Sequence, residues 1–264
     1  MAATMWEEKA WPKTYLINLA SSRERLEQAT IALRRAGMEF ERVAAVDGRQ
    51  KSADVFREYN RKMARRQYGR PLSGGEVGCF LSHRACVERF LATKEPYALV
   101  LEDDLLMPED FPQTLRLVLA WLDQSYGGKW DVINLGRTPK KYFREVQVFE
   151  PGGVPVTLCV ACYFPLCTFA LLWTREGAAA FLAASQTFAA PVDQFLRDWC
   201  AETARGLALT PALIGVVRGK SEIGNTLADR LFSNWFTYWF YKNRRLLRNQ
   251  RKARRAVRSV REAG

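Results

Sequence analysis

Residues 14–46 hold an apolar run, an amphipathic stretch and a second apolar run in immediate succession. The first run, residues 14–20, is rich in residues that favour β-structure, and the sequence Ser21-Ser-Arg-Glu24 after it has the capping-box pattern that starts a helix. One face of that helix is apolar and consists of Leu26, Ala29, Leu33 and Ala36. Residues 40–46 form the second predicted strand. A strand, a helix and a strand in 33 residues require parallel strands, so the sequence predicts an α/β fold.

A third predicted strand runs into three acids. It is preceded by Ser73-Gly-Gly-Glu76, which repeats the capping-box pattern and predicts a helix to about Ala92. Residues 97–101 are all apolar, as expected of a buried central strand, and continue directly into Glu102-Asp103-Asp104. Ligands bind to open α/β sheets outside the carboxyl ends of the strands. The three acids are therefore predicted at a ligand-binding edge.

The second half of the chain contains further strand and helix signals. Strands are expected at residues 131–135 and 169–173, and helices at 109–122, at 174–184 and from Pro191 to Trp199. Residues 136–155 have poor periodicity and are predicted as a substrate-facing loop. The longest nearly apolar run, residues 158–173, is shorter than the ~20 residues of a membrane-spanning helix. Buried strand is the better interpretation of that run.

The positive charge is concentrated at the C-terminus. The chain has 40 Lys and Arg against 28 Asp and Glu, a net charge of +12, and residues 242–264 hold ten of the basic residues against Glu262 alone. That segment contributes +9 and leaves +3 for the rest. We divide the chain into an N-terminal extension at residues 1–12, a main domain at 13–230 and an aromatic and basic helical tail at 231–264.

The tail has the composition of a membrane-surface helix. Six aromatic residues precede the basic run, namely Trp235, Phe236, Tyr238, Trp239, Phe240 and Tyr241. An apolar stripe at helical spacing follows, formed by Leu246, Gln250, Ala253, Val257 and Val260. Each basic residue near anionic lipid contributes ~1 kcal/mol, and aromatic rings favour the headgroup level. We predict peripheral contact with an anionic membrane through residues 235–261, in preference to nucleic acid; packing of the stripe on the domain is an alternative that is compatible with it.

The N-terminus and the cysteines point to a cytosolic protein. The first residues lack the basic stretch and apolar core of a signal peptide, so no export signal is expected, and six cysteines are then expected as reduced thiols. Cys159, Cys162 and Cys167 resemble part of a zinc cluster. A fourth ligand is missing and His83 is the only histidine, so buried free thiols are favoured.

The acids Glu102, Asp103 and Asp104 suit a hard cation. Along an extended strand end Glu102 and Asp104 would point to one side and Asp103 to the other. Two like charges on one side repel unless a cation lies between them, and carboxylate oxygens suit Mg²⁺ or Mn²⁺, which usually also bind substrate phosphates. The alternative is that the acids cap the following loop or pair with arginines.

The sequence lacks the motifs of several competing enzyme classes. It contains no G-x-x-x-x-G-K-[ST] phosphate loop, no G-x-G-x-x-G after the first strand and no serine nucleophile elbow. Kinase, dehydrogenase and hydrolase functions are disfavoured accordingly.

Five motifs follow one another along the chain: Tyr15-Leu-Ile-Asn-Leu19 with Arg25, Ala44-Ala-Val-Asp-Gly48, Leu72-Ser-Gly-Gly-Glu-Val-Gly-Cys-Phe-Leu-Ser-His83, Tyr97-Ala-Leu-Val-Leu-Glu-Asp-Asp104 and Pro191-Val-Asp193. In this order they resemble glycosyltransferase family 25, which includes bacterial lipooligosaccharide β-galactosyltransferases and is similar to the collagen galactosyltransferases. The resemblance extends from about residue 13 to residue 225.

This resemblance implies a glycosyltransferase A-type, Rossmann-like mixed sheet flanked by helices. It also implies a UDP-sugar donor, a divalent cation and inversion at the anomeric carbon. Asp104 would bind the metal, Glu102 would support it and Asp103 would contact the donor. The other donor-binding residues would be Asn18, Arg25, Asp47, Ser82 and His83. For two of these a simpler interpretation exists, because Arg25 would also suit a solvated helix surface and His83 a hydrogen-bonded structural position.

Asp193 is the predicted catalytic base. Inversion in one displacement needs a group that takes the proton of the acceptor hydroxyl while the sugar moves across. Asp193 would lie in the first turn of its helix, where a purely capping role is the alternative.

The predicted function is transfer of galactose, with glucose as the second choice, from a UDP-sugar to a lipooligosaccharide or lipopolysaccharide core. The enzyme would act on a lipid-linked acceptor at the cytoplasmic face of the inner membrane. The alternative is a catalytically inactive protein of the same fold that binds nucleotide sugars or membranes.

Overall fold

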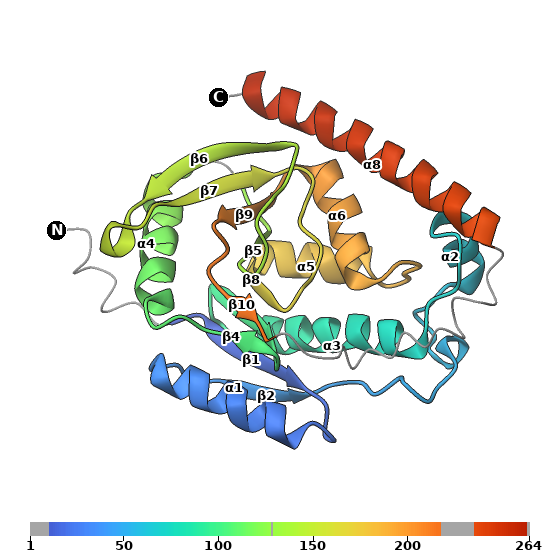
Figure 1. Ribbon diagram of the computed structural model, residues 1–264, viewed down its shortest axis with the longest axis horizontal. Helices are drawn as coiled ribbons and strands as arrows, with labels where there is room; N and C mark the ends of the chain where they lie inside the picture. Colours follow the sequence, from blue (N-terminus) through green and yellow to red (C-terminus); the bar gives the residue numbers. More distant parts are fainter. Residues whose placement is uncertain (1–10, 128, 218–234, 263–264) are drawn as a thin grey trace.

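A mixed β-sheet runs through the computed structural model, which describes residues 11–127, 129–217 and 235–262 (Figure 1). Among these residues eight strands follow the order β2-β1-β3-β8-β5-β9-β7-β6, and β10 pairs with β4 in a separate ribbon. The strands are β1 (Lys13–Asn18), β2 (Glu41–Ala44), β3 (Tyr97–Glu102), β4 (Leu105–Leu106), β5 (Val132–Asn134), β6 (Phe143–Phe149), β7 (Val156–Ala161), β8 (Ala170–Thr174), β9 (Gly206–Thr210) and β10 (Gly215–Val216).

Strand β1 is parallel to both of its neighbours, so β2, β1 and β3 end at the same edge. Alternate residues of β1 enter two different cores: Leu16 packs on one face of the sheet, and Tyr15 and Ile17 on the other. Strand β8 is antiparallel to β3 and β5, which makes the sheet mixed. The βαβ unit predicted from residues 14–46 is confirmed.

Helices cover both faces of the sheet (Figure 1). Helices α1 and α4 contribute to one core, and α3, α5 and α6 to the other. The helices are α1 (Arg23–Arg35), α2 (Arg61–Gln67), α3 (Gly74–Leu91), α4 (Phe111–Gln124), α5 (Arg175–Ala184), α6 (Val192–Thr203) and α8 (Trp235–Glu262), with short 3₁₀ turns at Ala53–Val55 and Pro151–Gly153.

One of the two predicted capping boxes forms. At the start of α3 the Ser73 hydroxyl accepts a hydrogen bond from the Glu76 N–H at 3.2 Å, and the Glu76 carboxylate accepts one from the Ser73 N–H at 2.9 Å. At α1 the prediction is wrong, because Ser22 is the N-cap and makes no capping hydrogen bond with its side chain. The Ser21 hydroxyl instead accepts a hydrogen bond from Arg49 at 2.9 Å.

The predicted loop at residues 136–155 is wrong in part, because it contains β6. This strand pairs antiparallel with β7, and its register shifts between Glu145 and Gln147. Most of its side chains are half-buried on both faces, so no apolar alternation marks it in the sequence. Residues 158–173 belong to two strands, β7 and β8, with a loop between them.

The basic tail forms helix α8, which lies along the outside of the domain (Figure 1). Ala253 and Val257 of the predicted stripe are buried, whereas Leu246 and Gln250 are only half-buried. The polar Arg245 and Asn249, which are outside the stripe, are buried as well, so the prediction is confirmed only in part. Arg248 forms an ion pair with Asp198 of α6 at 2.9 Å, and Lys252 pairs with Glu202 of the same helix. The boundary predicted between 230 and 231 and the side chain of Val260 lie outside the described residues. Among the residues described, no helix has the length and apolar character needed to cross a membrane.

Candidate active site

The carboxyl ends of β1, β2 and β3 meet at a pocket that is open to solvent. The structure brings eight of the nine predicted site residues to its wall: Asn18, Arg25, Asp47, Ser82, His83, Glu102, Asp103 and Asp104. Asp193 is the exception. Their meeting follows from the parallel pairing of three strands that are far apart in the sequence.

Close backbone contact between α3 and the loop after β2 shapes one wall. A Cβ on Gly74 would lie 2.1 Å from the Gly48 carbonyl oxygen, and a Cβ on Gly78 would lie 2.2 Å from that of Val46. The Ser82 hydroxyl accepts a hydrogen bond from the Val46 N–H at 2.9 Å and donates one to the Gly78 carbonyl at 2.7 Å. Ser82 therefore ties the loop to the helix.

Asp47 lies at the rim of this wall. The Arg49 guanidinium donates to both of its carboxylate oxygens, at 2.9 and 2.6 Å. These hydrogen bonds lower the pKa of Asp47 to about 2, so the carboxylate stays ionised.

Asn18 and Arg25 hold the second acid of the cluster. The Asn18 amide donates to Asp103 at 2.7 Å and to the Ser22 carbonyl at 2.9 Å, and its own oxygen accepts from Arg42 at 3.0 Å. The Arg25 guanidinium lies 3.5 Å from Asp103 and 3.9 Å from Asp104. Arg25 is therefore at the acid cluster rather than on a solvated helix face.

Asp103 and Asp104 do not follow the predicted strand alternation. Strand β3 ends at Glu102 and the chain turns, so one guanidinium group of Arg25 reaches both following acids. Pairing of the acids with an arginine, one of the alternatives drawn from the sequence, is thus partly realised.

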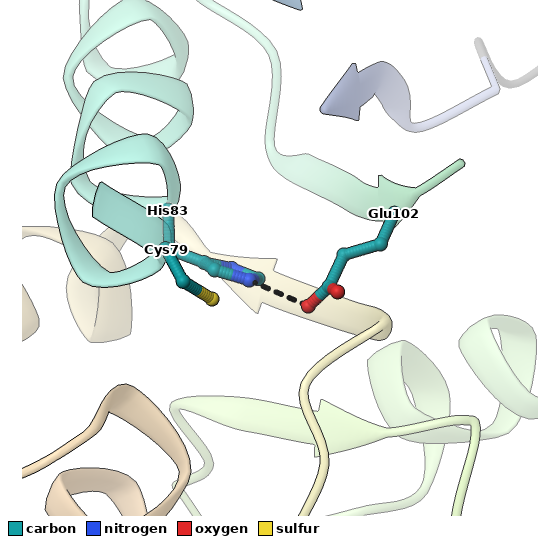
Figure 2. A group of neighbouring side chains, drawn as sticks. All are labelled: Cys79, His83 and Glu102. Carbon is teal, nitrogen blue, oxygen red and sulfur yellow. Dashed lines mark hydrogen bonds and ion pairs between the residues drawn. The ribbon is translucent and has the colours of Figure 1, made fainter. Parts of the chain in front are cut away.

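Glu102 points to helix α3 (Figure 2). One of its oxygens lies 3.1 Å from His83 Nε2 and accepts a hydrogen bond from the Thr168 hydroxyl at 3.1 Å. Burial raises the pKa of Glu102, but the hydrogen bond and charge of His83 and the hydrogen bond of Thr168 outweigh it, so the pKa is lowered overall. Glu102 is therefore held as a carboxylate.

Asp104 has the least compensated carboxylate of the cluster. Its Oδ1 is buried and has no hydrogen-bond partner among the described residues. Burial and the charge of Glu102 raise the pKa of Asp104 to about 6, although Arg25 lowers it. A cation beside Asp104 would offset both effects.

Asp193 lies at the start of α6, outside the pocket wall. One of its oxygens accepts a hydrogen bond from the Gln194 N–H at 2.7 Å, and the N-cap position of α6 is held by Pro191. Burial raises the pKa of Asp193, and its charge helps to raise the pKa of the Cys79 thiol in the pocket wall. Asp193 is therefore close to the pocket without lining it.

Three further side chains with polar or metal-binding groups belong to the site and were not predicted: Cys79, Arg49 and Thr168. Cys79 and His83 are four residues apart on one helix, a spacing that would have marked Cys79 as a neighbour of the pocket. Arg49 and Thr168 give no comparable signal, because their contacts depend on the fold.

The three cysteines considered for zinc are free, as are the other three. Cys159 and Cys162 are buried as expected, but Cys167 is exposed, so that part of the prediction is wrong. Among the described residues, the one group of three possible metal ligands that lies close together is Cys79, His83 and Glu102.

Comparison with known proteins fits this geometry. A family model described as glycosyltransferase family 25 (LPS biosynthesis protein) matches residues 11–151, which is more than half of the 264 residues. The chain belongs to glycosyltransferase family 25. The matched segment includes β1, β2, α3 and β3, and hence every residue of the pocket wall named above.

Relatives in family 25 are similar over most of this chain. An Aedes aegypti "Glycosyltransferase 25 family member" is 33% identical over 187 residues, or 69% of the chain. The human "Procollagen galactosyltransferase 2" is 29% identical over 197 residues, or 72% of the chain. The Rattus norvegicus "Probable inactive glycosyltransferase 25 family member 3" is 33% identical over 190 residues, or 70%.

The family 25 chain described here matches only part of these relatives. The alignments cover 30% of the mosquito and human proteins and 32% of the rat protein. Family membership and the α/β glycosyltransferase-like fold follow from the match, whereas the activity does not.

Proposed function

We propose that this chain is an inverting, metal-dependent glycosyltransferase. It would move galactose, with glucose as the second choice, from a UDP-sugar to a lipooligosaccharide or lipopolysaccharide core. The observation that carries the proposal is the buried, unpartnered oxygen of Asp104 beside Glu102 and Asp103 in a pocket at the carboxyl ends of parallel strands.

The residues at this edge fit a divalent cation. Asp104 and Glu102 offer hard oxygen ligands, and the raised pKa of Asp104 reflects a local excess of negative charge. Mn²⁺ or Mg²⁺ would be held by Asp104 with support from Glu102. When bound, such an ion would act as a Lewis acid on the departing diphosphate.

The other residues would bind and orient the donor. Asn18 and Arg25 position Asp103, which would contact the ribose or the sugar of the donor. Asp47 and Ser82 lie on the loop side of the pocket, where the uridine would bind. His83 would act through Glu102, because its Nε2 is engaged there.

Asp193 would serve as the base that takes the proton of the acceptor hydroxyl. Its raised pKa moves the carboxylate toward the range in which a general base is effective near neutral pH. Its position outside the donor pocket suits a group that meets the acceptor rather than the donor.

The choice of sugar and acceptor is based on the names of the relatives and of the family, and on the positive charge of helix α8. Several relatives are named procollagen galactosyltransferases, which supports galactose, and the family description names LPS biosynthesis, which supports a bacterial lipid-linked acceptor. Helix α8 presents Trp239, Phe240 and Leu247 as exposed apolar side chains among arginines. That face supports peripheral contact with anionic lipid at the cytoplasmic face of the inner membrane.

The test is release of UDP from UDP-galactose in the presence of lipooligosaccharide core acceptors, with and without Mn²⁺. We expect turnover to require the ion and to fall at least about 100-fold in Asp104→Ala, since the ion stabilises the leaving group. Normal turnover in that variant would refute the proposal. UDP-glucose serves as the alternative donor and procollagen as the alternative acceptor.

The second candidate is a catalytically inactive protein that binds nucleotide sugars or membranes. It is favoured by the rat relative whose name describes it as inactive. Binding of UDP-galactose without transfer to any acceptor of the panel would support this alternative.

A further inference from the structure

We propose that the pocket contains a second metal site, formed by Cys79, His83 and Glu102, which binds a zinc-type ion. The possible ligand atoms of these three side chains all lie within 4.8 Å of one another. Figure 2 shows Cys79 and His83 on one face of α3, both directed toward Glu102 at the end of β3.

The spacing suits chelation. Cys79 and His83 are separated by four residues, so one turn of helix brings both side chains to the same face. Two ligands at this spacing and a third from a neighbouring element form the usual three-ligand set of an open zinc site. The fourth position would face the pocket, since all three residues line it.

The donor atoms select a different ion from the one proposed at Asp104. Thiolate and imidazole favour zinc over magnesium or manganese, whereas the oxygen ligands of Asp104 and Glu102 favour the harder ions. On binding, zinc would displace the thiol proton of Cys79 to solvent.

The surroundings favour an ion at this point. His83 is 1% exposed, and its Nδ1 has no hydrogen-bond partner among the described residues. A buried polar atom of this kind needs a partner, which a bound ion or its water can provide. Glu102, Asp193, Glu76 and Asp104 all act electrostatically on the Cys79 thiol, and the negative potential that they produce attracts a cation.

Glu102 belongs to both sets of ligands, so the two ions would compete. Zinc bound to Cys79 and His83 would hold Glu102 at helix α3 and so weaken the binding of Mn²⁺ beside Asp104. The zinc site itself stands on its own ligands and does not depend on sugar transfer.

The experiment uses the full chain, reduced and stripped of metal with a chelator, and titrated with Co²⁺ as a spectroscopic probe of the zinc site. We expect a thiolate-to-cobalt charge-transfer band in the near ultraviolet, lost on addition of stoichiometric Zn²⁺. Cys79→Ser should abolish the band and lower zinc affinity at least about 100-fold, because even outer-shell changes cost about 10–100-fold. Cys167→Ser, which removes an exposed cysteine, should leave both unchanged.

Zinc X-ray absorption provides the second measurement. The chain has a single histidine, so an imidazole in the zinc coordination shell identifies His83. Circular dichroism of Cys79→Ser checks that the variant is folded, and Cys79→Ala replaces it if it is not. Equal zinc affinity in wild type and a folded Cys79 variant, or a zinc shell without sulfur and imidazole, would overturn the site.

A titration with Mn²⁺, followed by electron paramagnetic resonance, separates this site from the catalytic one. Weaker Mn²⁺ binding in the zinc-loaded protein is expected from the shared Glu102. If Mn²⁺ fails to bind the metal-free protein at all, the proposed catalytic ion fails while the zinc site stands.

Discussion

Asp104 links the stability of this protein to pH. Its folded pKa of about 6 lies above the ordinary value of 3.8, so its ionised form is disfavoured in the folded state. The resulting loss of folding stability is fully present above the folded pKa of Asp104. It disappears below the ordinary pKa, where this carboxyl is protonated in both the folded and the unfolded chain. Each tenfold change in an acid constant is worth ~1.4 kcal/mol, so the cost is at most about 3 kcal/mol.

Asp104→Asn should therefore stabilise the metal-free protein. We expect its unfolding free energy at about pH 8 to exceed that of wild type by about 1–3 kcal/mol, and the difference to vanish below about pH 4. Denaturant melts in chelator at both pH values measure this. Added Mn²⁺ should raise the stability of wild type and not of the variant. A wild type more stable than Asp104→Asn in chelator at about pH 8 would contradict the assigned environment of this carboxylate.

The contact between α3 and the loop after β2 is the element on which the pocket wall depends. Replacing a glycine by alanine inside a helix normally stabilises it by up to ~1 kcal/mol. At Gly74 the sign should reverse, because the added Cβ would meet a backbone oxygen at 2.1 Å. Gly74→Ala is expected to cost about 1–3 kcal/mol and to weaken UDP binding.

Gly127→Ala is the matched control, since its added Cβ would meet no atom within 4 Å. Thermal melts and a UDP titration of both variants give the comparison. If Gly74→Ala were as stable as Gly127→Ala and bound UDP normally, the close contact would not be what shapes the wall.

Helix α8 has a buried face and an exposed face. A substitution to glutamate on each face distinguishes their contributions to stability. Ala253 is fully buried against the domain, whereas Arg251 is exposed. Ala253→Glu buries an unpaired charge and should cost at least about 2 kcal/mol, whereas Arg251→Glu should remain within about 0.5 kcal/mol of wild type. Chemical denaturation of the two variants tests the docking of the helix, and equal stabilities would refute it.

The whole molecule is expected to bind anionic vesicles through the exposed face of α8. Substituting Trp239 and Phe240 by serine together with Arg251→Glu should reduce flotation with phosphatidylglycerol vesicles, since each basic residue contributes ~1 kcal/mol near such a surface. Ile31→Ser removes an exposed apolar side chain of α1 and serves as the control. The triple variant and the control should give the same oligonucleotide shift at matched salt, which would disfavour nucleic acid as the partner of this face. Unchanged flotation of the triple variant would refute the membrane face.

Much of the fold could be predicted because its signals are local. The apolar period of α1, the capping box at Ser73 and the apolar run of β3 act over a few residues, and each formed the expected element. Strand β6 has no such signal, since its partly buried side chains reflect an edge position that only pairing with β7 creates. The same limit applies to Arg49, whose hydrogen bond to Ser21 replaced a predicted cap.

By itself, the sequence determined the α/β class, the edge of the sheet at which the acids lie and the family. These follow from apolar periodicity and from motifs that each occupy a short stretch of chain. Only the tertiary structure decided how the acids divide: Glu102 turns to His83, Asp103 to Asn18, and Asp104 is left with a buried oxygen. It also decided that Cys79 joins His83 and Glu102 and that α8 docks on the domain. Those outcomes depend on contacts between segments that are distant in the chain, and burial, pairing and charge acquire definite values only after folding.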